Sequence, residues 1–150
     1  MKMEDVFLSI QERIAESLPE LSLVDEDYGQ LITEGDTYPV TFPCVLIGNI
    51  EADWQHVGLG AEKGVCTVTI KLAIDCYNDT HYSSGTSDKI RERLNLNRRV
   101  YLALQGFRSS REMSALIRVK STDYSLPGGI KVYETVFQFT CHDESALTRP

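Results

Sequence analysis

The chain has no apolar run approaching the roughly 20 residues that a membrane-spanning helix needs. Its start also differs from a secretory signal peptide, which has a positive first segment and a longer apolar one. Glu4 and Asp5 stand where that pattern would place basic or apolar residues. We therefore expect a protein that is made in the cytoplasm, is not processed and makes no membrane contact.

Cysteine is present, but not in the patterns that bind metals. The four cysteines form no Cys-x-x-Cys pair and no compact ligand spacing. Cys44, Cys66 and Cys76 lie inside apolar, strand-like segments, and Cys141 ends another such segment. We expect reduced, buried thiols and predict no metal or other cofactor.

The sequence also lacks a catalytic signature. Cys141-His142-Asp143 contains the residue types of a triad, but adjacent side chains of an extended strand point to opposite faces and could not cooperate. The glycines from Gly58 to Gly64 lack the Gly-Lys-Ser/Thr of a phosphate loop. We therefore predict no catalytic residue. An enzyme that uses His81 or Asp75 is kept as an alternative.

Basic residues are scarce in the first part of the chain. Residues 1–60 contain two bases and twelve acids, a net charge of −10, whereas residues 61–150 contain thirteen bases and ten acids, a net charge of +3. The total of −7 disfavours nucleic-acid contact. If the two halves form separate faces, copies of the chain could dock head to tail.

The strongest pattern that is present runs from Val65 to Asn78. From Cys66 to Cys76 every even-numbered residue is apolar, and the residues between them are mostly small or polar. This period of two predicts a long strand with one apolar face. That face requires a covering layer.

The remaining segments supply that layer. The patterns predict helices over 4–18 and from about 88 to 105, and strands over 44–50, 115–124 and 130–141. In the second helix Ile90, Leu94 and Leu104 belong to the expected buried stripe. The glycine-rich residues 51–64 are expected to form a long, mobile hairpin tip. We predict one α+β domain over residues 1–150, a mainly antiparallel sheet of four or five strands with two helices packed on one face.

The order of these pieces resembles the tail-terminator and tail-completion proteins of tailed bacteriophages and prophages. The similarity covers nearly the whole chain in patterns and short phrases. The phrases are Asp27-Tyr-Gly-Gln-Leu31, Tyr38-Pro-Val-Thr-Phe-Pro-Cys-Val-Leu-Ile47, the Thr67–Asn78 strand and Leu104-Gln-Gly-Phe107. The resemblance implies a structural subunit of a homo-oligomeric ring, commonly of six, that caps the tail tube and joins it to the head. The implied partners are the tail tube protein and the head–tail connector protein, in the host cytoplasm during assembly and then in the virion tail.

The family shares no contact motif, so the candidate interface residues come from this sequence alone. They fall in the hairpin tip, a basic stretch and an acidic turn. They are Trp54, His56 and Leu59; Arg91, Arg98, Arg99, Arg108 and Arg111; and Asp25 and Asp27. Opposite charges on two surfaces suit a head-to-tail ring. A head–tail connector, another minor tail protein and a separate ligand-binding domain are the remaining alternatives.

Overall fold

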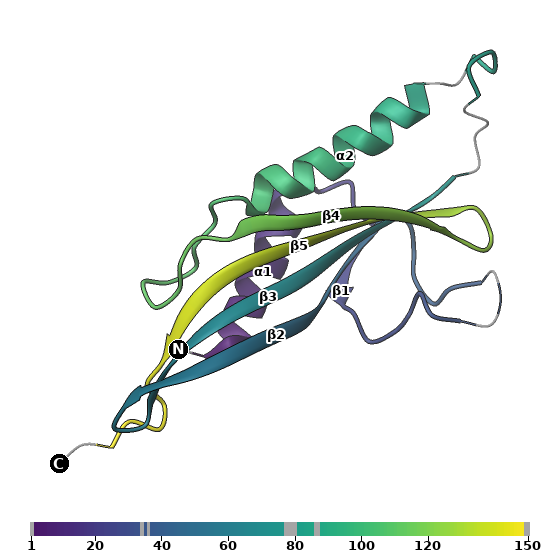
Figure 1. The fold of residues 1–150 in the computed structure, drawn as a ribbon. Coiled ribbons are helices and arrows are strands. Elements are labelled where there is room, and N and C mark those ends of the chain that lie inside the picture. Colours follow the sequence, from purple (N-terminus) through teal and green to yellow (C-terminus); the bar gives the residue numbers. More distant parts are fainter. Residues whose placement is uncertain (1, 34, 36, 77–80, 86–87, 149–150) are drawn as a thin grey trace.

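The computed structural model describes residues 2–33, 35, 37–76, 81–85 and 88–148, which form a five-stranded sheet and two helices (Figure 1). The elements are α1 (Met3–Ser17), β1 (Leu23–Glu26), β2 (Cys44–Gly58), β3 (Ala61–Asp75), α2 (Asp88–Leu104), β4 (Ile117–Leu126) and β5 (Ile130–Asp143). The strands lie in the order β1-β2-β3-β5-β4. Only the β1–β2 pairing among these is parallel. The predicted α+β class and mainly antiparallel sheet are confirmed.

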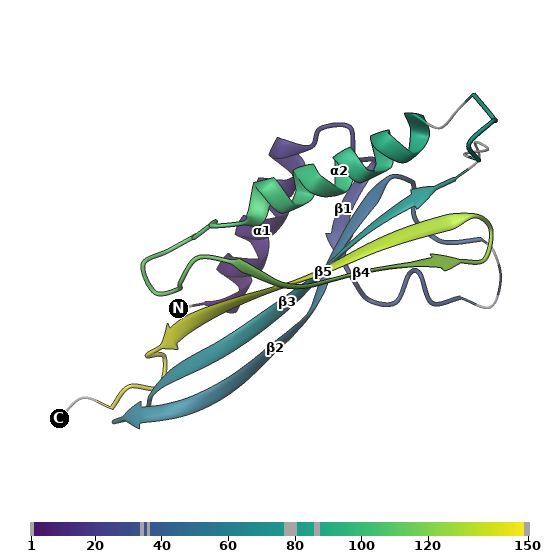
Figure 2. The same cartoon turned by 45° about the horizontal axis from the view of Figure 1, so that its top comes forward.

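β3 lies at the centre of the sheet, and its apolar face is buried as its alternating pattern predicts. Its even-numbered apolar side chains from Cys66 to Ile74 are at most 8% exposed. They form one core with Val6, Ile10 and Ile14 of α1 and with the C-terminal turns of α2. Figure 2 shows both helices on this one side of the sheet. The helices therefore cover the apolar face of β3.

A second, smaller core lies on the opposite face of the sheet. It contains Cys44 and Leu46 of β2 and Val132 of β5, covered by Leu31 and Tyr38 from the segment between β1 and β2. The Tyr38 hydroxyl donates a hydrogen bond of 2.8 Å to the carbonyl of Pro127. This contact fixes the covering segment to the β4–β5 turn. β5, apolar on both faces in sequence, therefore lies inside the sheet with a core on each side.

The prediction of a long hairpin tip over residues 51–64 is wrong. β2 continues to Gly58 and β3 begins at Ala61, so that only Leu59 and Gly60 form the turn. Both have positive φ values, 54° and 87°, as a two-residue turn of the I′ type requires. The glycines and polar residues of 51–64 suggest a loop, but cross-strand pairing satisfies their backbone groups and makes a paired ribbon.

Gly64 in this ribbon serves packing and not loop formation. It lies opposite Trp54 in the β2–β3 register. A Cβ atom at Gly64 would come within 2.8 Å of Cζ3 of Trp54 and 3.2 Å of Sγ of Cys141. The glycine thus leaves room for the indole ring to lie across the neighbouring strand.

The buried stripe of α2 also differs from the prediction. The helix buries Val100, Ala103 and Leu104, whereas Ile90 is 41% and Leu94 52% exposed. The N-terminal end of α2 diverges from the sheet (Figures 1 and 2). Apolar periodicity gives the spacing of a stripe, but the angle at which the helix crosses the sheet decides how much of that stripe is covered.

Candidate functional site

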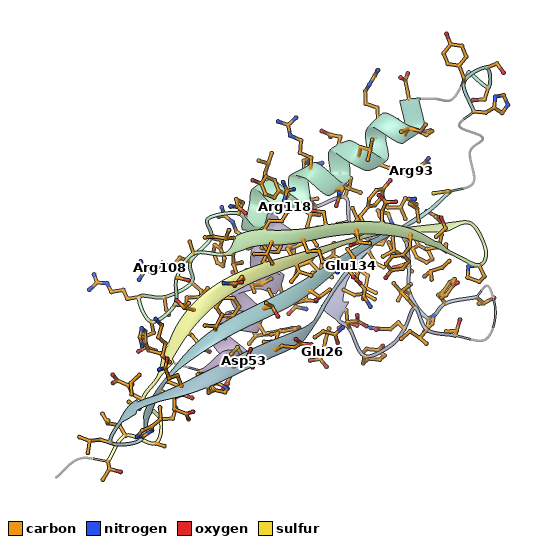
Figure 3. The ribbon with its side chains drawn as sticks, viewed as in Figure 1. Glu26, Asp53, Arg93, Arg108, Arg118 and Glu134 are labelled. Atoms are coloured by element: carbon orange, nitrogen blue, oxygen red, sulfur yellow. The ribbon has the colours of Figure 1, made fainter. Side chains whose placement is uncertain are left out.

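The strand order separates the two charge classes in space. The acidic first part of the chain supplies β1 and β2, at one edge of the sheet, and the later, more basic part supplies β4 at the other edge and α2. Figure 3 places Glu26 and Asp53 along the first edge, and Arg93, Arg108 and Arg118 along the side of β4 and α2. The uneven charge distribution of the sequence therefore becomes two differently charged sides of the sheet and its helices.

Two of the predicted interface arginines, Arg99 and Arg108, bond to backbone carbonyls of the same chain. The Arg99 guanidinium forms an ion pair with Glu20 and donates to the carbonyl of Ser17, which links α2 to the end of α1. The Arg108 guanidinium donates to the carbonyls of Ser110 and Arg111 at 3.0 and 2.9 Å. Both side chains thus hold local structure, which a partner would have to compete with.

Arg91 and Arg98 lie on the outward surface of α2. The surface has a shallow depression of about 500 Å³. It is lined by Asp88, Ile90, Arg91, Leu94, Asn95 and Arg98. Arg91 pairs with Asp88 at 3.1 Å, and both side chains are more than 80% exposed, so this pair holds them weakly. Arg111 lies apart from these residues, in another depression formed with the start of α1.

The predicted acidic turn divides into two kinds of residue. Asp27 forms an ion pair of 2.9 Å with Lys71 of β3, and the side chains are 9% and 13% exposed. Burial lowers the pKa of Lys71, but the hydrogen bond and charge of Asp27 outweigh it, so that the pKa is raised. Asp25 instead accepts a hydrogen bond from the backbone amide of Glu26. Asp27 is therefore occupied internally, and Asp25 is the more accessible acid of the two for a partner.

The hairpin residues remain exposed although the tip is short. Trp54 is 43% and Leu59 67% exposed, and His56 is also exposed. Leu59 adopts the left-handed backbone conformation that disfavours branched or bulky side chains. Its carbonyl accepts a hydrogen bond from the amide of Thr148, so the C-terminal segment lies against the turn. An exposed leucine at the turn suits a contact site, and its interface role remains a prediction.

An acidic groove beside α1 was not predicted from the sequence. It has a volume of about 370 Å³ and combines apolar side chains with two carboxylates. Its lining is Met3, Glu4, Phe7, Leu8, Glu26 and Ile50. In the sequence, Leu8 is an apolar residue of α1 that lies outside its buried stripe. In the structure, Leu8 is 56% exposed and lines the groove. The groove depends on β1 and β2 meeting α1, which no local pattern specifies.

Cys141 and His142, two of the residue types of a catalytic triad, do not share a site. Cys141 is buried with its Sγ 3.4 Å from Sγ of Cys66, whereas His142 is exposed. Burial and the neighbouring Cys141 raise the pKa of Cys66 to about 12, which keeps it a thiol. Burial likewise raises the pKa of Cys44 to about 12. Asp75 ends β3 half-buried, and Nδ1 of His81 lies 3.1 Å from the Ser83 hydroxyl.

Within the part of the chain that the structure describes, no cluster of three or more histidine, cysteine, aspartate or glutamate side chains could hold a metal ion. Among the same residues, no helix combines the length and apolar character needed to cross a membrane.

Comparison with known proteins identifies the fold. No protein-family model and no curated protein matches the chain. Among solved structures, the chain is similar to a chain of the "Virion of native gene transfer agent (GTA) particle". The two share 13% sequence identity with a TM-score of 0.57, and the match covers 89% of this chain and 92% of the other. The similarity shows a common fold over nearly the full length of both chains.

Proposed function

We propose that this chain is a structural subunit of a phage-like virion, and that it forms a tail-terminator ring that caps the tail tube and joins it to the head. The observation that carries the proposal is the fold shared with the gene transfer agent virion chain, over 89% of this chain and 92% of that one. With this coverage, the two chains share the fold of nearly the whole subunit and not only of one motif. The proposed role requires no reaction and no cofactor.

The separation of charge supports a ring in particular. A head-to-tail contact uses two different surfaces of each subunit, and it closes into a ring when the rotation between neighbours completes a circle. Surfaces of opposite charge attract each other and discourage contacts between like surfaces. The β1–β2 side and the α2 side meet this requirement (Figure 3). The proposed partners are further copies of the chain, commonly six in all, together with the tail tube protein and the head–tail connector protein.

The test is assembly with the tail tube. The chain would be added to polymerising tail tube protein from the same virion, and the tubes would be imaged by negative-stain electron microscopy. We expect a ring at one end of each tube and shorter tubes as the proportion of the chain increases, because a capped end adds no more subunits. Native mass spectrometry of the chain alone would give its oligomeric state over a concentration series.

Three results would change the assignment. Binding to the head complex without binding to tubes would favour a head–tail connector. Binding along the length of the tube would indicate another minor tail protein. If the chain associates with neither tube nor head proteins, the proposed virion role is wrong.

A further inference from the structure

We propose that the outward surface of α2 in one copy docks into the acidic groove beside α1 of the next copy. This contact specifies the subunit–subunit partner surfaces of the proposed function and rests on it. The α2 ridge is the name used here for the side chains of Ile90, Arg91, Leu94 and Arg98, which project from α2 around the shallow depression described above. The acidic groove is lined by Met3, Glu4, Phe7, Leu8, Glu26 and Ile50.

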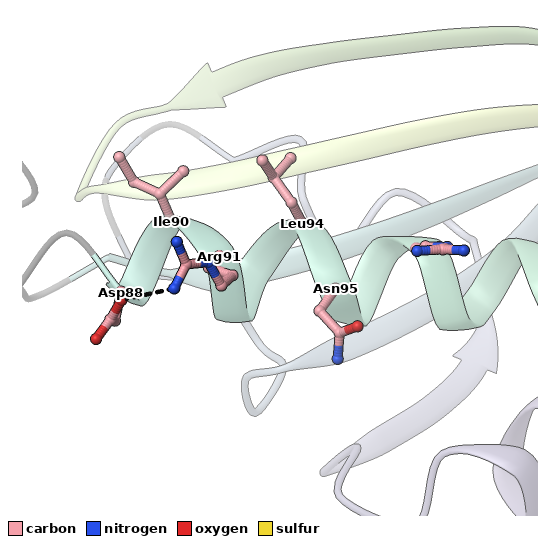
Figure 4. A pocket seen from close by; sticks show the side chains of 6 residues that line it. Asp88, Ile90, Arg91, Leu94 and Asn95 are labelled. Carbon is pink, nitrogen blue, oxygen red and sulfur yellow. Dashed lines mark hydrogen bonds and ion pairs between the residues drawn. The ribbon is translucent and has the colours of Figure 1, made fainter.

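The α2 ridge has the character of a contact surface. Ile90 and Leu94 are 41% and 52% exposed, and Figure 4 shows them projecting from α2 in the same direction. Arg91 and Arg98 line the same depression. Leu102, one further turn along the helix, is 57% exposed. Contiguous apolar side chains rimmed by charge are typical of protein–protein interaction sites.

The acidic groove has the matching composition. Met3, Phe7, Leu8 and Ile50 provide apolar lining, and Glu4 and Glu26 provide two negative charges. Two exposed aliphatic side chains and two arginines would therefore meet an apolar groove with two carboxylates. Arginine and carboxylate groups can form paired hydrogen bonds that fix the orientation of the docked helix.

The two surfaces cannot meet within one copy. The groove belongs to the β1–β2 side of the sheet, and α2 diverges on the side of β4 (Figures 1 and 2). The contact is therefore between copies and joins two different surfaces, as a head-to-tail ring requires. We choose a second copy over another virion protein as the occupant because the complementary charges and apolar lining are both present on this chain.

Charge exchange tests the contact directly. The ridge variant carries Arg91→Glu and Arg98→Glu, and the groove variant carries Glu4→Lys and Glu26→Lys. We expect each variant alone to associate about 100-fold more weakly than the wild type, because like charges would face each other across the contact. Mixing the two variants should restore assembly with alternating subunits. In the mixture one contact has wild-type charges and the other has both charges exchanged.

A control variant also carries two charge reversals, one base and one acid outside both surfaces, and keeps the net charge of the wild type. Lys120→Glu and Glu144→Lys alter exposed residues of β4 and of the segment after β5, and this double variant should assemble as the wild type does. Circular dichroism and thermal unfolding would establish that every variant is folded. Unchanged assembly of either the ridge or the groove variant, or a mixture that fails to assemble, would overturn the contact.

If the wild-type chain is monomeric in solution, cross-linking tests whether the α2 ridge and the acidic groove meet in transient contacts. Leu8→Cys and Leu94→Cys, in separate Cys76→Ser chains, should form a mixed disulfide on oxidation at high concentration. Each cysteine variant alone should form far less dimer. If the Leu8–Leu94 pair does not cross-link in a monomeric wild type, the contact is wrong.

The same variants separate this contact from the proposed function. If the chain caps tubes but the Leu8–Leu94 cross-link does not form, the virion role is supported and the inferred contact is wrong. If rings form only with an intact α2 ridge but bind no tube or head protein, the contact is supported and the virion role is wrong. A ridge variant that still forms rings but no longer binds the tube would assign the ridge to the tube protein and overturn the inference.

Discussion

At the scale of single residues, the structure separates charges that hold the fold from charges that are available to partners. Asp27 and Arg99 belong to the first group through their contacts with Lys71 and Glu20. Arg91 and Arg98 belong to the second, because they line the open surface of α2. A reversal of Arg98 and Arg99 together would therefore disturb the link between α1 and α2 as well as any interface. Arg98 with Arg91 is the cleaner pair to change.

The Asp27–Lys71 ion pair gives a stability prediction. Lys71→Met should lower the free energy of unfolding by about 3 kcal/mol, because a carboxylate that is only 9% exposed would lose its partner. Urea denaturation would measure the loss. The double variant Asp27→Asn/Lys71→Met should recover part of it, since no uncompensated charge remains. A Lys71→Met variant as stable as the wild type would mean that the pair does not stabilise the fold.

At the scale of elements, the β2–β3 ribbon and α2 carry most of what is unusual in this domain. The ribbon is longer than its polar composition suggests and ends in a turn that contains a leucine with a positive φ. α2 buries its C-terminal turns and leaves apolar residues exposed toward its N-terminus. The ribbon thus has a strained backbone position at Leu59, and α2 has uncovered apolar side chains at Ile90 and Leu94.

The turn gives a prediction at this scale. Leu59→Asn should raise the free energy of unfolding by about 1 kcal/mol, because asparagine tolerates the left-handed conformation better than leucine does. Thermal and urea unfolding would measure the gain. Gly60→Ala is the contrasting variant, since its Cβ would lie 2.1 Å from the carbonyl oxygen of Ala146 and should destabilise the turn. Loss of stability in Leu59→Asn would show that the leucine side chain itself holds the turn.

At the scale of the whole molecule, the fold presents differently charged sides at its two sheet edges. This arrangement follows from the chain order of the strands, because residues 1–60 supply β1 and β2 and later residues supply β3, β5 and β4. Self-association through these sides would combine apolar burial with ion pairs. Salt screens the ion pairs and weakens them, whereas it does not screen the burial of apolar side chains.

Assembly should therefore weaken with ionic strength. Raising the salt concentration from about 0.05 to 0.5 M shortens the range of electrostatic interactions to a few ångströms, and we expect about tenfold weaker association. Analytical ultracentrifugation over a salt series would measure it, with the unfolding curve of the monomer as the control for stability. Association that is unchanged or strengthened by salt would indicate a contact without the inferred ion pairs.

The sequence by itself determined the α+β class, the helix α1 and the long strand β3 with its one apolar face. Each rests on a local period, because alternation of apolar residues specifies a strand face and a spacing of three and four specifies a helix face. The uneven charge distribution was also visible in the sequence. None of these features depends on how distant segments meet.

Only the tertiary structure decided the extent of the hairpin, the direction of the Ile90–Leu94 stripe and the acidic groove. Glycine and polar residues in 51–64 favour a loop locally, but pairing between β2 and β3 supplies backbone hydrogen bonds that outweigh this preference. The exposure of Leu94 depends on how α2 crosses the sheet, and the groove requires α1, β1 and β2 to converge. Long-range packing sets these positions, and no period along the chain encodes it.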